Sequence, residues 1–155
     1  MNLEYSQRKR PVHMPPIERH NVPVILFVTI GLQPRTPNLA DEHFHNAFIL
    51  ACQGANSWTV GRYLIMPDHI HLFCRPASDP RMGIKPWSSF LKRQMSAHYG
   101  PHDWGWQSDI WDTQIRNGEH YREKWDYIRQ NPVRQGWVEL AEKWPWQGEL
   151  HEVLW

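Results

Sequence analysis

Residues 58–75 read WTVGRYLIMPDHIHLFCR, a stretch in which two strand-like runs meet at Pro67-Asp68. Both runs are rich in β-branched, aromatic and aliphatic residues, and a Pro-Asp pair favours a tight turn. The pattern therefore predicts a β-hairpin with antiparallel strands. Working outward from it, the rest of the chain has to supply further strands and the helices that cover them.

Side chains alternate between the two faces of a strand, so His69 and His71 should stand side by side on one face of this hairpin. The opposite face is wholly apolar and suits a core: Ile70, Leu72 and Cys74. Two neutral imidazoles on one face can chelate a divalent metal. The alternative is that both are polar residues at the edge of a hairpin, and this pair alone leaves that choice open.

The segments around the hairpin alternate between strand and helix patterns. We predict strands at 22–31 and 110–116, helices at 41–53, 84–98 and 118–131, and a shorter element at 133–142. Asn117 is a suitable N-cap for the helix over 118–131, and Pro132 marks its end. The order of elements predicts an α+β fold, an antiparallel β-sheet with packed helices as in ferredoxin-like and RRM-like domains.

Length and composition indicate one soluble domain. The chain has 155 residues, a formal net charge of +1 and ten tryptophans, an unusually high number. We expect an N-terminal arm over 1–21, flexible or draped over the domain, a folded domain over 22–146 and a C-terminal tail over 147–155. The two cysteines lack metal-ligand spacing, which favours reduced thiols and the cytoplasm. No apolar run is long enough to span a membrane, and no signal peptide is recognisable.

A second His-x-His pattern, His43 and His45, serves as a control. It falls in a predicted helix, where residues two apart point about 200° away from each other. That pair should not share a metal, so the pattern is informative only on a strand.

The predicted helix over 118–131 adds a candidate nucleophile. Its buried stripe should contain Tyr121, Trp125 and Ile128, which puts Tyr127 on a polar face. Asn131 follows one turn later. A phenol beside a possible oxygen ligand suits nucleophilic attack next to a metal, although Tyr127 is also explained as a surface tyrosine that forms hydrogen bonds.

Four motifs occur in order along the chain: MPDHIHLF, FLKRQ, WQSDIWDTQIRN and YIRQNPVRQGWV. Together they resemble the REP-associated tyrosine transposases, which are single-tyrosine HUH endonucleases. The resemblance extends from about residue 22 to 146. It implies an HUH nuclease fold and an enzyme that cleaves and rejoins single-stranded DNA in transposition and recombination.

The same resemblance implies roles for individual residues. His69 and His71 would be metal ligands, Asn131 would complete the site around Mg²⁺ or Mn²⁺, and Tyr127 would form a 5′-phosphotyrosine. The family commonly has asparagine where this chain has Asp68, which is a turn residue or approaches the metal. The implied substrate is hairpin-forming palindromic DNA of the REP type, and the implied state is a monomer, with a dimer possible, associated with the nucleoid in the cytoplasm.

Candidate phosphate contacts come from a weak local excess of positive charge, and they are Lys85, Lys92, Arg93, Arg116, Arg129 and Arg134. The alternatives for Trp87, Trp104 and Trp106 are stacking on unpaired nucleobases and packing in the protein core. Two other functions remain open: a catalytically inactive nucleic-acid-binding protein of the same fold, and a structural zinc protein using the histidines.

Overall fold

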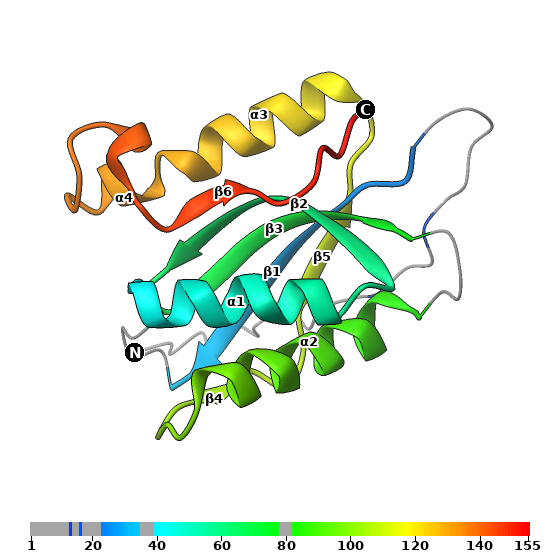
Figure 1. Ribbon diagram of the computed structural model, residues 1–155. Coiled ribbons are helices and arrows are strands. Elements are labelled where there is room, and N and C mark those ends of the chain that lie inside the picture. Colours follow the sequence, from blue (N-terminus) through cyan, green and yellow to red (C-terminus); the bar gives the residue numbers. More distant parts are fainter. Residues whose placement is uncertain (1–12, 14–15, 17–22, 35–38, 78–81) are drawn as a thin grey trace, which may run out of the picture.

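The computed structural model describes residues 13, 16, 23–34, 39–77 and 82–155 (Figure 1). The elements in chain order are β1 (Leu26–Gln33), α1 (Glu42–Gly54), β2 (Trp58–Met66), β3 (His69–Pro76), α2 (Ile84–Tyr99), β4 (Gly105–Trp106), β5 (Trp111–Gln114), α3 (Gly118–Arg129), α4 (Asn131–Arg134), the 3₁₀ turn η1 (Ala141–Lys143) and β6 (Gln147–Glu149). No helix among the described residues is long and apolar enough to cross a bilayer.

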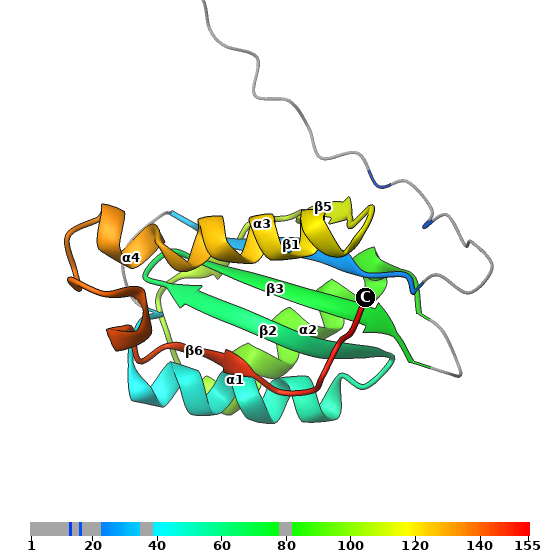
Figure 2. The same cartoon turned by 90° about the horizontal axis from the view of Figure 1, so that it is seen from above.

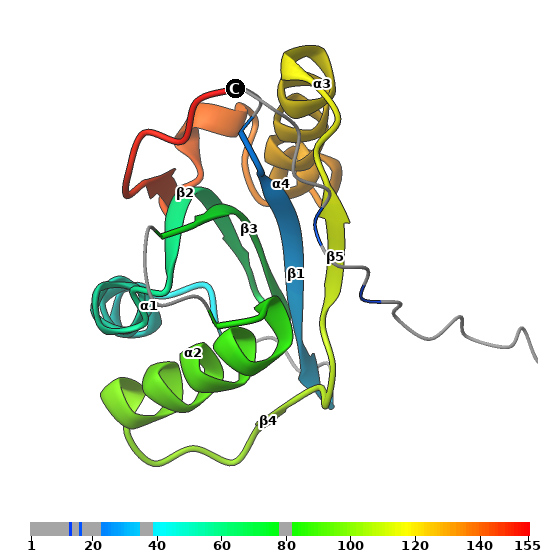
Figure 3. The same ribbon diagram turned by 90° about the vertical axis from the view of Figure 1, so that its right-hand side faces the viewer.

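The strands form one antiparallel sheet in the order β4-β1-β3-β2-β6, and β5 also pairs with β1. Helices α1 and α2 cover one face, and α3 lies over the other (Figures 1 and 3). The predicted hairpin is present as β2 and β3, which pair with Met66 opposite His69. The predicted α+β fold with an antiparallel sheet is therefore confirmed.

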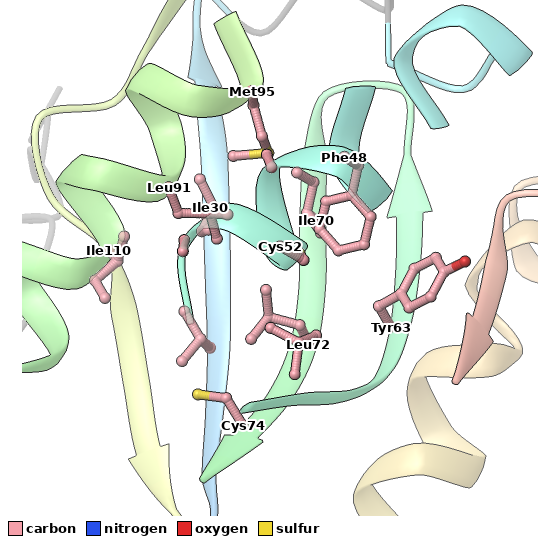
Figure 4. Close-up of a cluster of buried hydrophobic side chains, with 14 of the residues drawn as sticks. Ile30, Phe48, Cys52, Tyr63, Ile70, Leu72, Cys74, Leu91, Met95 and Ile110 are labelled. Carbon is pink, nitrogen blue, oxygen red and sulfur yellow. The ribbon is translucent and has the colours of Figure 1, made fainter. Parts of the chain in front are cut away.

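Strand alternation divides the apolar side chains into two cores. The larger core lies between the sheet and α1 and α2, and it includes Ile30 of β1, Ile70 and Leu72 of β3, Phe48 of α1 and Leu91 of α2 (Figure 4). The smaller core lies under α3. Its strand residues occupy the alternate positions and are Phe27, Leu64, Met66 and Phe73; the other members are Ile25 and Ile115 beside the strands, Tyr121 and Ile128 of α3, and Trp144 and Val153 from the C-terminal region. His69 and His71 belong to the alternate positions, so they face the α3 side.

Helix α3 begins where the sequence predicts. The Asn117 side chain accepts a hydrogen bond from the backbone N–H of His120 at 2.8 Å. The helix runs over β1 and β3 (Figure 2), with the Tyr121 ring centred 4.5 Å from that of Phe73. It ends at Arg129, two residues before the predicted end.

The early end of α3 has a physical reason in Pro132, which lacks a backbone N–H and is unfavourable inside a helix. In the first turn of a helix the missing donor costs nothing, and Pro132 takes such a place in α4. Asn131 consequently begins a new short helix and does not extend α3.

The region between α2 and α3 forms one interrupted edge strand along β1. Strand β4 pairs with Leu32 and Gln33, and β5 pairs with Leu26 to Thr29. Between them the backbone N–H of Gln107 donates to the Gly31 carbonyl at 2.8 Å. The sequence predicts a single short strand at 110–116, and the structure has two.

The C-terminal residues are part of the fold. The sequence predicts a separate tail over 147–155, whereas β6 pairs with Arg62 to Leu64 of β2, and Val153 is buried. A Cβ at Gly61 would lie 2.8 Å from the Val153 side chain, so this glycine permits the close approach. The expected N-terminal arm, 1–21, lies outside the described residues except for His13 and Pro16. His13 makes hydrogen bonds to Asp109 and Asp112.

Candidate active site

The two histidines of the hairpin converge on one point. Their Nε2 atoms lie 3.1 Å apart, and the rings meet nearly edge to face at 79°. This follows from their same-face placement at the start of β3.

The partners of the Nδ1 atoms determine what the Nε2 atoms present. His69 Nδ1 lies 2.6 Å from Asp68 Oδ1, and an ionised carboxylate only accepts, so the proton is on His69 Nδ1. His71 Nδ1 lies 2.9 Å from the Thr29 hydroxyl, a group that both donates and accepts; in the tautomer with the proton on Nδ1, the hydroxyl accepts in the same way. Both neutral rings would then direct Nε2 lone pairs at each other, an arrangement that a cation between them would relieve.

His71 is held in its neutral form. The pKa of His71 is lowered to about 3, mainly by burial and also by charge repulsion from the nearby His69 and Lys124. The Phe27 ring stacks on the imidazole, with centroids 5.3 Å apart and planes at 20°. The ring is therefore fixed in orientation and is available as a ligand at neutral pH.

The spacing of the rings suits a divalent cation. Bonds of about 2.0–2.1 Å would separate two ligand atoms by about 2.9 Å at a right angle and about 3.3 Å at a tetrahedral angle. The observed 3.1 Å lies between these values. Among the described residues, no three His, Cys, Asp or Glu side chains gather as metal ligands, so further ligands here would be amide, water or substrate oxygens.

Asn131 lies beside the histidines. Its Nδ2 is 3.5 Å from His71 Nε2, and its Oδ1 accepts a hydrogen bond from Arg134. Presenting Oδ1 to a cation would require the amide to turn over. The structure thus brings together the three predicted ligands, with the amide in the opposite orientation.

Tyr127 is connected to this group through Arg134. The Arg134 guanidinium lies 4.3 Å from the centre of the Tyr127 ring and donates to the Tyr127 carbonyl oxygen at 2.9 Å. The tyrosine side of α3 is open, with Tyr127 66% exposed. The predicted polar face of the helix is therefore observed; of the predicted buried stripe, Tyr121 and Ile128 are buried and Trp125 is half-buried.

The six predicted phosphate contacts fall into two groups on opposite faces of the sheet: Arg116, Arg129 and Arg134 on the α3 side, and Lys85, Lys92 and Arg93 on α2. Lys92 is buried, and its ammonium donates to the Gln107 carbonyl at 2.8 Å. Burial is also the main reason that the pKa of Lys92 is lowered. Lys92 therefore stabilises the edge strand, and a DNA phosphate would have to displace the Gln107 carbonyl to contact its ammonium.

The tryptophans named as possible stacking partners are mainly structural. Trp87 is fully buried and donates its indole N–H to the Ala55 carbonyl, and Trp104 is also buried. Trp106 is half-buried and packs against Trp104 at 5.1 Å. For Trp87 and Trp104 the core alternative is the one observed.

The helical control pair behaves as expected. His43 donates to the Tyr99 carbonyl at 2.7 Å, whereas His45 shares a hydrogen bond of 2.6 Å with the Tyr63 hydroxyl. The two rings point to different partners.

Several residues around the histidines were not found from the sequence. Thr29 contacts His71 from another strand, and Lys124 lies 5.2 Å from the Phe27 ring centre on the α3 side. The Gln107 side chain occupies the space over Gly31, the cross-strand partner of His69. The ladder register between β1 and β3 identifies Thr29, and only the packing of α3 and of the edge strand on the sheet identifies Lys124 and Gln107. Asp68, left open above, turns out to orient His69.

Comparison with known proteins shows the family of this chain. No family model matches the chain. A curated relative from Haemophilus influenzae, named as a REP-associated tyrosine transposase, is 30% identical over 146 residues, covering 83% of this chain and 81% of the relative. The REP-associated tyrosine transposase of Escherichia coli is 28% identical over 122 residues, covering 77% and 72%.

A solved structure has the same fold over most of its length. It is a REP-associated tyrosine transposase bound to a REP hairpin, and it matches with a TM-score of 0.66 and 25% identity over 86% of this chain and 82% of that one. With sequence identity and fold in agreement over most of both chains, this protein belongs to the family of REP-associated tyrosine transposases.

Proposed function

We propose that this protein is a metal-dependent endonuclease and strand transferase that acts on single-stranded DNA beside hairpin-forming palindromes. Tyr127 is the nucleophile, and His69, His71 and Asn131 hold Mg²⁺ or Mn²⁺. The observation that carries the proposal is the convergence of two imidazole Nε2 atoms at 3.1 Å, with Asp68 2.6 Å from one Nδ1 and the Thr29 hydroxyl 2.9 Å from the other.

The reaction is a transesterification. The Tyr127 oxygen attacks phosphorus, the bond from phosphorus to the 3′ oxygen breaks, and the 3′ oxygen leaves as a hydroxyl after taking a proton. The downstream strand stays attached to the protein as a 5′-phosphotyrosine. Attack by a 3′-hydroxyl on that ester reverses the step, so strands are rejoined or transferred without ATP. A bound divalent cation would supply charge neutralisation on the scissile phosphate.

The surroundings of Tyr127 position its phenol, and a bound cation would have to help activate it. A free phenol has a pKa near 10 and is a weak nucleophile at neutral pH. The Arg134 guanidinium lies over the Tyr127 ring, 4.3 Å from its centre, and restricts the orientation of the ring. Arg134 therefore acts on the nucleophile directly as well as being a candidate phosphate contact.

The proposed DNA partner is a hairpin of the REP type, the ligand named for the solved relative. Arg116, Arg129 and Arg134 would contact the strand near Tyr127, and Lys85 and Arg93 a more distant part of the DNA, whereas the buried Lys92 is held by the Gln107 carbonyl. We expect a monomer acting at the nucleoid.

Covalent capture tests this proposal. A hairpin oligonucleotide with a single-stranded flank and a label at its 3′ end is incubated with protein and Mn²⁺, and labelled protein is sought after denaturation. Wild-type protein should give an adduct, and Tyr127→Phe should give none. Mn²⁺ should support the reaction at least as well as Mg²⁺, because imidazole is a softer ligand than Mg²⁺ prefers.

Tyr99→Phe is the matched control, since Tyr99 lies on α2 on the opposite face of the sheet, and it should form the adduct normally. An adduct that persists in Tyr127→Phe would assign the nucleophile elsewhere. Tight binding of palindromes without any cleavage across a panel of flanks would instead indicate an inactive DNA-binding protein.

A further inference from the structure

The ladder register places an exposed indole in the same row as the metal-ligand candidate His71. Thr29 of β1 is paired with His71 on one side and with Trp111 of β5 on the other. Directly opposite residues in antiparallel strands project from the same face. Trp111 therefore stands on the α3 face, with only Thr29 between it and His71 across the sheet.

The distance along this row is short. Neighbouring strands lie about 4.8 Å apart, so the Trp111 and His71 backbones are separated by about 10 Å. A short stretch of single-stranded DNA covers such a distance. A phosphate at the histidines would therefore leave a neighbouring base within reach of the indole.

Trp111 differs from the other tryptophans near the sheet in being open. Its side chain is 45% exposed, whereas Trp104 is 5% exposed and Trp87 fully buried. No aromatic ring among the described residues stacks on it, whereas the similarly exposed Trp137 is stacked on Trp144 at 5.5 Å. An indole with an open π-face is the kind of side chain that stacks on unpaired bases.

The surroundings of the row also suit a nucleic-acid strand. Thr113, the next β5 residue on this face, is exposed and lies opposite Phe27. The Lys124 ammonium lies 5.2 Å from the Phe27 ring centre and adds positive charge between β1 and α3. The acidic Asp112 alternates to the other face, where it bonds to His13.

We propose that Trp111 is a stacking platform for an unpaired nucleobase next to the scissile phosphate. This rests on the function proposed above, and it adds the residue that positions the single-stranded flank on the sheet. It also differs from the stacking partners suggested by the sequence, because Trp111 was not among them.

Fluorescence of 2-aminopurine tests the platform without requiring cleavage. Hairpin oligonucleotides carry 2-aminopurine at successive positions of the single-stranded flank, and they are bound to the Tyr127→Phe protein. At one position next to the scissile phosphate, binding should quench the fluorescence, and adding Trp111→Ala should abolish that quenching. Trp137→Ala, equally exposed but already stacked, should leave it unchanged.

Affinity measurements give a second, independent readout. Removing one aromatic platform should weaken binding of the flanked hairpin by about 5- to 150-fold, while the hairpin without its flank binds unchanged. With an abasic nucleotide at the quenched position, Trp111→Ala should cause no further loss. Trp111→Phe should retain part of the affinity.

Two kinds of failure are distinguishable. If Trp111→Ala retains wild-type quenching and affinity, or if its effect is the same on intact and abasic DNA, the platform is refuted even though wild-type protein forms the tyrosine adduct. If no adduct forms with wild-type protein while quenching depends on Trp111, the cleavage proposal fails and the DNA contact stands.

Discussion

Replacing Thr29 by valine tests whether the hydroxyl on β1 prepares His71 as a metal ligand. The two side chains have nearly the same shape, so the change removes one hydrogen-bond acceptor and little volume. In the wild type the hydroxyl lies 2.9 Å from His71 Nδ1. Without it, the Nδ1 proton loses its partner, and the ring is free to adopt the tautomer with the proton on Nε2, which cannot bind a cation.

The expected loss follows from the kind of contact. Removing a hydrogen-bond partner of a ligating histidine typically reduces metal affinity by about 10- to 100-fold, which corresponds to about 1.4–2.7 kcal/mol. Leaving a buried donor unsatisfied also lowers the free energy of unfolding by about 1–3 kcal/mol. Because His71 is only half-buried, we expect the lower part of the stability range.

Calorimetric titration with Mn²⁺ measures the affinity, and urea unfolding in the presence of a chelator measures the stability. Thr29→Ser keeps the hydroxyl and should bind Mn²⁺ nearly as well as the wild type. A Thr29→Val protein that is folded and binds Mn²⁺ with wild-type affinity would refute the role assigned to this hydrogen bond, and with it the tautomer inferred for His71.

Two further predictions concern stability. The pKa of His71 is lowered to about 3, mainly by burial, whereas a histidine in the unfolded chain has a pKa near 6.5. Between these two values the unfolded chain binds more protons than the folded protein, so the free energy of unfolding should fall as the pH is lowered through this window. Urea titrations at pH 7 and pH 5 should show a smaller fall for His71→Asn than for the wild type. An equal fall in that variant would contradict the assignment. Trp87→Ala should lose about 3–5 kcal/mol because the indole is fully buried, whereas Trp111→Ala should change stability by about 0.5 kcal/mol at most, both measured by thermal or urea unfolding.

The features that the sequence predicted well depend on short-range periodicity. Alternation along 69–75 placed the histidines on one face, and helical spacing separated Tyr127 from the buried Tyr121 and Ile128. The Asn117 cap was also predicted correctly. Each of these depends only on residues within a few positions of one another.

What the sequence did not predict depends on pairing between distant segments. Thr29 and His71 are 42 positions apart, and Arg62 of β2 and Glu149 of β6 are 87 apart. The sequence neighbours of Lys92 are polar and suggest an exposed position, but its ammonium donates a hydrogen bond to the Gln107 carbonyl of the edge strand and is buried. Such contacts can be predicted only once the order and the register of the strands in the sheet are known.

Strand β6 also covers an edge of the sheet at which another molecule could otherwise add a strand. Without it the sheet would terminate at β2, and the amide and carbonyl groups of Arg62 to Leu64 that β6 now pairs would be free to recruit a strand from another molecule. The opposite border is short and broken between β4 and β5, which makes it a poor template for such growth. A chain shortened to residue 146 would thus be expected to aggregate, even though every proposed catalytic side chain would still be present.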